Sequence, residues 1–184
     1  ARLDAGRELR REEVDLVGLL VDTVADARAA GPDHDWQLDL AVLEPPADAT
    51  PQEAEDFLPE PPLVIGDEAR LRQVVVNLLA NARVHTPAGS HVTTTLAREG
   101  DTLIVRIHDD GPGIAPDVRD RLFERFARGD SSRERRTGST GLGMSIALAI
   151  VQSHGGSIDV DSSTAPEDHG TTFSVRLPAA VVEE

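Results

Sequence analysis

The chain has 184 residues, a formal net charge of −15 and no cysteine. Its length suits one domain with a short appendage, and its charge argues against nucleic acid or an anionic membrane surface as the main partner. Disulfides and thiolate metal sites are excluded, and because no stretch has the length and apolarity of a membrane span, we expect no direct membrane contact by this segment.

The first elements expected along the chain are helical. Residues 1–10 have the composition of the end of a helix, which closes near Gly6. A second helix is predicted from a cap at Asp15 to Ala30, with Gly31 and Pro32 as its stop. Its buried face is predicted from four apolar residues: Val17, Leu20, Val21 and Val24.

Two strands and a long connection follow. Trp36 to Leu43 alternates between apolar and polar residues and predicts a strand. Glu44 to Pro62 is rich in proline and acidic residues, which is typical of a solvated loop. Leu63 to Ile65 is predicted as a short second strand.

A helix from Glu68 to His85 carries two stripes. The apolar stripe, predicted to face the core, consists of Leu71, Val74, Val75, Leu78, Leu79 and Ala82. Beside it, Asn77, Asn81 and His85 recur at i, i+4 spacing, although asparagine is a mediocre helix former. This polar stripe is either a solvated flank or a pair of amide oxygens offered to a hydrated magnesium ion.

A hairpin leads into the first glycine-rich segment. Its strands are predicted over Val92 to Arg98 and Thr102 to His108. Asp109 continues the parity of the buried residues in the second strand, so its carboxylate should point inward, where it needs a donor such as a ligand amine. Gly111 and Gly113 permit close approach of main chain to a flat ligand. An ordinary turn is the alternative for this segment taken alone.

The next stretch contains phenylalanines, arginines and a second glycine pair. Leu122 to Phe126 is predicted to pack on the core. The four arginines of the loop from Ala127 to Thr140 suit either a lid over phosphates or a solvated loop. Gly141 to Gly143 precedes an apolar helix that ends at His154, and exposed amides at a helix start can bind phosphate. Two last strands are predicted near residues 157–161 and 171–177.

Five of these segments, taken together and in their order along the chain, resemble the conserved boxes of the ATP-binding catalytic domain of sensor histidine kinases. This domain belongs to the gyrase, chaperone and mismatch-repair ATPase superfamily. The resemblance runs from Asp67 to Pro178. It rests on an N box (Asn77 to Ala82), a first glycine box (Asp109 to Gly113), an F box (Leu122 to Phe126), a second glycine box (Gly141 to Gly143) and a closing box (Gly170 to Phe173). It implies an α+β fold, a two-layer sandwich with helices on one face of a mixed sheet.

The resemblance also implies roles for individual residues. Asp109 would bind the adenine amino group, Thr171 would line the base pocket, and Asn81 would ligate Mg²⁺. Asn77, near the metal, and Arg128, reaching the phosphates, would be the catalytic residues. The remaining nucleotide-binding residues would be His85, Gly111, Gly113, Ile114, Phe126, Thr140, Gly141, Leu142 and Gly143.

The implied reaction is transfer of the γ-phosphoryl group of ATP to a histidine. No histidine here begins the phosphoacceptor motif, so we expect the acceptor on a separate dimerisation domain upstream, of which residues 1–10 would be the tail. Residues 11–184 would be the catalytic domain, with 44–62 as an acidic loop and 127–140 as the ATP lid. The further partner would be a response regulator, and the location cytoplasmic, as part of a membrane-bound sensor.

Three departures from the family pattern leave alternatives open. Val84 stands where the family usually has a cation that touches phosphate, Ser139 replaces a common glycine, and Met144 replaces a leucine. A degenerate domain that binds partners without turning over ATP is one alternative. An ATP-driven clamp would carry a glutamate where Asn77 stands, and an anti-sigma serine kinase is disfavoured by the F box and the long lid.

Overall fold

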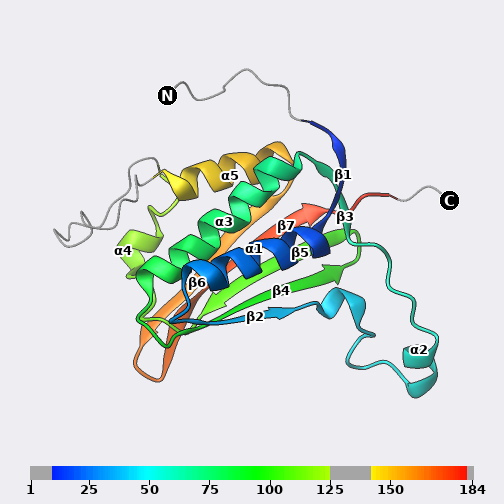
Figure 1. The fold of residues 1–184 in the computed structure, drawn as a ribbon, viewed down its shortest axis with the longest axis horizontal. Coiled ribbons are helices and arrows are strands. Elements are labelled where there is room, and N and C mark those ends of the chain that lie inside the picture. Colours follow the sequence, from blue (N-terminus) through cyan, green and yellow to red (C-terminus); the bar gives the residue numbers. More distant parts are fainter. Residues whose placement is uncertain (1–9, 125–141, 182–184) are drawn as a thin grey trace.

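The computed structural model describes residues 10–124 and 142–181, which form a five-stranded mixed sheet with helices on one side (Figure 1). The strand order is β2-β4-β5-β7-β6, in which β2 pairs parallel to β4 and the other neighbours are antiparallel. The strands are β2 (Asp35–Asp39), β4 (His91–Glu99), β5 (Thr102–Asp109), β6 (Ser157–Ala165) and β7 (Asp168–Pro178). The predicted two-layer α+β sandwich is confirmed.

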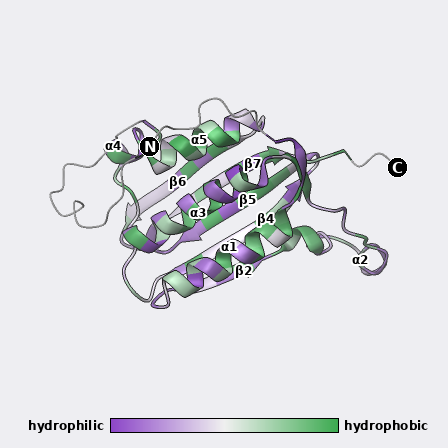
Figure 2. Cartoon of the chain, turned by 45° about the horizontal axis from the view of Figure 1, so that its top comes forward, coloured by the Kyte–Doolittle hydropathy of each residue, from purple (hydrophilic) through white to green (hydrophobic). Residues whose placement is uncertain are grey.

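The helical layer consists of α1 (Leu16–Ala30), α3 (Glu68–His85) and α5 (Gly143–Ser153). Figure 2 shows hydrophilic and hydrophobic residues alternating along α1 and α3, as expected where one helix face covers a sheet. The bounds predicted for α3 are confirmed, with the Asp67 side chain accepting from the Arg70 amide as N-cap. All six residues of its apolar stripe are buried, and each fully buried leucine contributes about 1.5–3 kcal/mol.

The predicted face of α1 is partly wrong. Asp15 does cap this helix, accepting from the Val17 amide, but Val21 is 46% exposed and the buried residues include Leu16 and Leu19. The core-facing stripe therefore runs one position earlier than the valines suggest. A single exposed valine is common on protein surfaces, so an apolar residue at this spacing does not identify the buried face by itself.

A small second sheet pairs β1 (Glu12–Asp15) antiparallel to β3 (Leu63–Gly66). The strand at Leu63 was predicted, whereas β1 was not, because its sequence Glu-Glu-Val-Asp offers only Val14 for burial. The predicted helix end near Gly6 lies outside the described residues.

The strand predicted to reach Leu43 ends at Asp39. Leu40 leaves the extended region, with φ −103° and ψ 56°, and the chain then forms a 3₁₀ turn, η1 (Ala41–Leu43). The solvated loop predicted after it contains one short helix, α2 (Pro51–Glu55), stabilised by a capping box between Thr50 and Glu53. Neither η1 nor α2 has a repeating pattern of hydrophobic residues from which it could be predicted.

The last two strands form a longer hairpin than predicted. Pairing of β6 with β7 continues from Asp161 to Ala165, through polar residues that hide the strand pattern. A short helix, α4 (Pro116–Arg119), was also missed. Leu122 and Phe123 pack against the core, as predicted for this segment, whereas Phe126 lies outside the described residues.

Candidate nucleotide-binding site

Asp109 is the last residue of β5, and its side chain lies on the helix-covered face of the sheet with only 5% exposed. The predicted inward direction of this carboxylate is therefore confirmed. Burial, the largest influence, raises the pKa of Asp109 and outweighs the opposing hydrogen bond donated by the Gly111 amide at 3.0 Å. Among the described residues only the Gly111 amide donates to this buried carboxylate, which is therefore suited to accept a hydrogen bond from a ligand.

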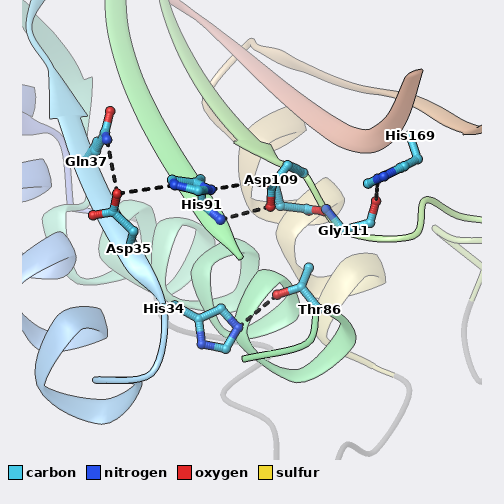
Figure 3. Close-up of polar contacts among 9 residues, drawn as sticks. His34, Asp35, Gln37, Thr86, His91, Asp109, Gly111 and His169 are labelled. Atoms are coloured by element: carbon cyan, nitrogen blue, oxygen red, sulfur yellow. Dashed lines mark hydrogen bonds and ion pairs between the residues drawn. The ribbon is translucent and has the colours of Figure 1, made fainter. Parts of the chain in front are cut away.

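The turn after Asp109 requires its two glycines. A Cβ at Gly111 would overlap the methyl group of Thr86, just beyond the C-terminus of α3. Gly113 has φ +77°, and a Cβ there would overlap the Ser163 carbonyl oxygen on β6. Thr86 donates to the Ala82 carbonyl oxygen and lies 2.8 Å from Nε2 of His34 (Figure 3), so it is itself held in place. The turn is therefore fitted closely between helix and sheet.

Thr171 lies directly across from Asp109 in the register of β5 and β7 and is 4% exposed. Its hydroxyl is 2.8 Å from that of Ser162, its neighbour on β6. Ser162 also accepts from the Ile114 amide at 2.8 Å and donates to the Gly170 carbonyl oxygen at 2.9 Å. Ser162, which sequence reasoning did not single out, thus joins Ile114, the residue directly after the first glycine box, to the closing box.

The polar stripe of α3 runs beside the start of α5. The Asn77 amide nitrogen donates to the Gly143 carbonyl oxygen at 3.2 Å, so the N box contacts the second glycine box. A carbonyl can only accept, so the side-chain nitrogen of Asn77 must face it, and the amide oxygen points elsewhere. Asn81 is half-buried one turn later, and His85 is exposed. The stripe therefore offers amide oxygens next to a helix N-terminus.

These amide oxygens fit a magnesium ion that keeps most of its waters and binds phosphate oxygens. No cluster of three histidine or acidic side chains that could hold a metal exists within residues 10–124 and 142–181. Magnesium at this site would take the Asn81 amide oxygen, water and nucleotide oxygens as ligands.

Asp110 points to the opposite side from Asp109 and binds His91. Asp110 accepts from the His91 backbone amide and lies 2.8 Å from the ring nitrogen Nδ1. On the other side of the ring, Nε2 of His91 is 3.7 Å from Asp35 (Figure 3). Burial would raise the pKa of Asp110, but the two hydrogen bonds from His91 outweigh it and lower the pKa. His169 holds the same turn, with Nδ1 2.8 Å from the Gly111 carbonyl oxygen. The sequence analysis missed the His91 contact because it depends on the β4–β5 register, which places Val92 opposite Asp109.

The structure brings together eight of the predicted nucleotide-binding positions around these turns and the two helices. They are Asn77, Asn81, Asp109, Gly111, Gly113, Ile114, Gly143 and Thr171, with His85 and Leu142 at the ends of α3 and α5. Four further predicted residues, Phe126, Arg128, Thr140 and Gly141, lie outside the described residues, as does the predicted lid.

The other end of α3 carries a separate set of contacts. His154 accepts from the Asp67 amide through Nε2 at 3.0 Å, and its Nδ1 lies 2.7 Å from the Ile150 carbonyl oxygen. The Asp67 carboxylate, in turn, accepts from the Arg10 amide. Because α3 has 18 residues, this end lies about 27 Å along the helix from His85, where the first glycine box packs against Thr86. It joins β1 to the helical layer and contains no predicted nucleotide-binding residue.

Comparison with known proteins identifies the family. A sequence model described as "Histidine kinase-, DNA gyrase B-, and HSP90-like ATPase" matches residues 66–181, which is more than half of the chain. The chain belongs to this ATPase family. It is therefore an ATP-binding domain, and the family membership agrees with the resemblance predicted from the five boxes.

Relatives of this ATPase domain are sensor histidine kinases. The chain is 49% identical over 178 residues to "Probable sensor histidine kinase TcrY" of Mycobacterium tuberculosis, a match that covers 97% of this chain and 33% of the relative. It spans a third or less of the length of the curated relatives it matches.

Solved structures similar to this ATPase domain include mycobacterial sensor histidine kinase MprB. The TM-score is 0.73 at 29% identity, covering 91% of this chain and 98% of that chain. Full-length ShkA in complex with AMPPNP has a TM-score of 0.72 at 26% identity, covering 98% of this chain and 33% of that chain. Within the residues that the structure describes, no helix combines the length and apolarity needed to cross a membrane.

Proposed function

We propose that this chain is the catalytic domain of a sensor histidine kinase, which transfers the γ-phosphoryl group of ATP to a histidine on a separate dimerisation domain. The observation that carries the proposal is the buried pair Asp109 and Thr171, facing each other across two strands beside a glycine turn. An inward carboxylate accepts hydrogen bonds from the adenine amino group, and the adjacent turn lets the flat base lie against main chain.

Asn77, Asn81 and the second glycine box form the phosphate end of the proposed site. The contact of Asn77 with the Gly143 carbonyl oxygen supports this grouping, because it ties the polar stripe of α3 to the N-terminus of α5. Asn81 would hold Mg²⁺, which neutralises phosphate charge when bound. Phosphoryl transfer needs little covalent help from the protein, so the contribution of these residues is to position the nucleotide. Arg128 completes the proposed catalytic set from outside the described residues.

The proposed partners are the dimerisation domain that carries the acceptor histidine and a response regulator that receives the phosphoryl group. The sensor histidine kinases to which the chain is similar support this proposal, because the chain matches about a third of their length and leaves room for other domains. We place the proposed reaction in the cytoplasm, where ATP is available, as part of a membrane-bound sensor. The net charge of −15 supports the absence of nucleic acid from the partners.

Incubation with γ-labelled ATP tests the proposal. The chain alone should remain unlabelled, whereas a separately supplied dimerisation domain with its histidine should acquire acid-labile label. Transfer should be slow, because separated parts lack the effective concentration that a tether provides.

Two α3 variants sharpen this experiment. Asn81→Ala should reduce transfer strongly, because it removes the proposed metal ligand without touching the apolar stripe. Val76→Ala, at a position 44% exposed on the same helix, should leave transfer unchanged. If ATP binds but no label reaches the added domain, a degenerate binding module, for which Val84 is the main argument, describes the chain better. Acid-labile label on the chain alone would show that the acceptor lies within it.

A further inference from the structure

The hydroxyl of Ser162 has no unused hydrogen-bonding capacity. It lies 2.9 Å from the Gly170 carbonyl oxygen, 2.8 Å from the Ile114 amide nitrogen and 2.8 Å from the Thr171 hydroxyl. A serine hydroxyl has one hydrogen to donate and two lone pairs to accept with. Three contacts therefore use the group completely, and the chemistry of its neighbours decides which way each hydrogen points.

Two of the neighbours have fixed roles. The Gly170 carbonyl oxygen can only accept, and the Ile114 amide can only donate. If Ser162 donated to Thr171 instead, its oxygen and the Gly170 oxygen would face each other 2.9 Å apart without a hydrogen between them. The consistent arrangement has Ser162 donating to Gly170, so Thr171 must donate its own hydrogen to Ser162.

This arrangement determines what Thr171 can offer a ligand. With its only hydrogen directed toward Ser162, the Thr171 hydroxyl has only lone pairs left, so it can accept but cannot donate. Asp109, its cross-strand partner, is also an acceptor when ionised. Residues directly opposite on the same face of a sheet have Cβ atoms about 4.5–5.5 Å apart, so both groups face the same small volume. That volume favours a group with hydrogens and disfavours a carbonyl.

We propose that Ser162 is a specificity-determining residue, which fixes the Thr171 hydroxyl as an acceptor and so selects a base carrying an exocyclic amine over one carrying a carbonyl. The inference rests on the proposed nucleotide site. Ser162 acts through Thr171, and it is a positioning residue that touches the Ile114 amide and the closing box. Losing one matched acceptor, or gaining one donor, changes relative affinity on the order of tenfold.

The ratio of the Kd values for the magnesium complexes of non-hydrolysable GTP and ATP analogues, measured by calorimetry, tests the inference. Ser162→Ala releases the Thr171 hydrogen, which can then donate to the guanine carbonyl, so the GTP-to-ATP ratio should fall on the order of tenfold. Ser162→Thr keeps a hydroxyl and should retain the ratio. Ser162→Cys, a less disruptive change with a weaker donor and acceptor, should give a smaller fall. Ser174→Ala, a hydroxyl removed from the opposite face of β7, is the control.

A double-mutant cycle separates this role from simple loosening of the glycine turn. In a Thr171→Val background no hydroxyl remains to be oriented, so Ser162→Ala should have no further effect on the ratio. Equal weakening of both nucleotides by Ser162→Ala, or the same ratio change with and without Thr171, would overturn the inference alone. Failure of the unsubstituted chain to bind ATP would contradict the proposed function and, with it, this inference.

Discussion

Replacing Asp109 with asparagine should weaken ATP binding while making the protein without nucleotide more stable. The carboxylate is 5% exposed, so solvent screens its hydrogen bond to a ligand amine very little. An asparagine that keeps its oxygen toward the Gly111 amide leaves one polar atom unmatched against adenine, at a cost of about 1–3 kcal/mol. That cost corresponds to roughly a 5- to 150-fold rise in Kd, which titration calorimetry measures directly.

Asp110→Asn is the matched control, because it removes the same charge from the next residue. Asp110 binds His91 on the other side of the turn, so its substitution should leave the Kd for ATP nearly unchanged. Equal affinities in Asp109→Asn and the unsubstituted chain would refute the assignment of the base pocket. Equal losses in both variants would indicate a general charge effect instead of a specific hydrogen bond.

The two aspartates should also have opposite effects on unfolding. Burial raises the pKa of Asp109 in the folded protein above its value in the unfolded chain. The protonated side chain therefore contributes its full stability below the unfolded-state pKa, and this contribution is lost as the pH rises through the folded-state pKa. At neutral pH its charge is therefore unfavourable, and Asp109→Asn should raise Tm. The pKa of Asp110 is lowered by His91, so its contribution is present above the unfolded pKa and is lost as the pH falls. Asp110→Asn should lower Tm at neutral pH, and thermal scans of both variants check the signs.

Two further substitutions test the ends of the site. Val84→Lys should tighten ATP binding by about 1 kcal/mol in calorimetry, because it adds a cation on the polar flank of α3. Val76→Lys on the same helix is the control and should leave the affinity unchanged. Equal affinities for both variants and the unsubstituted chain would mean that other cations already bind the phosphates. Gly113→Ala should lower Tm more than Gly89→Ala in a thermal scan. Both glycines have positive φ, but of the two only Gly113 has a main-chain oxygen where the new Cβ would lie. Equal decreases in Tm would show that the backbone conformation alone determines the effect.

Local patterns predicted the elements whose burial follows a regular period. The helix α3 was predicted with its bounds and six buried residues, because its apolar stripe repeats over 18 residues. The inward direction of Asp109 followed from the parity of β5 in the same way. Elements stabilised by contacts far apart in the chain were missed. Strand β1 is held by pairing with β3 about 50 residues away, and β6 continues through polar residues because β7 pairs with them.

The site was predictable where it depends on residue type and unpredictable where it depends on register. The glycines indicated the turns of the site, because few other residues suit such turns. The asparagines indicated the polar stripe, because asparagine is unusual inside a helix. The Asn77 contact with Gly143 and the bond between Ser162 and Thr171 span segments whose relative placement only the folded sheet and helices define. The same holds for Val21, whose exposure depends on how α1 is rotated against its neighbours.

The most direct test of the central claim is to locate ATP on the chain. A nitrogen-edited NMR titration with a magnesium complex of a non-hydrolysable ATP analogue should shift the amide signals of Gly111, Ile114 and Gly143. The amides of Val14 and Ile65, in the small sheet beyond the other end of α3, should stay unchanged. Shifts confined to that small sheet, or no shifts at saturating nucleotide, would contradict the assignment of the nucleotide site to the glycine boxes.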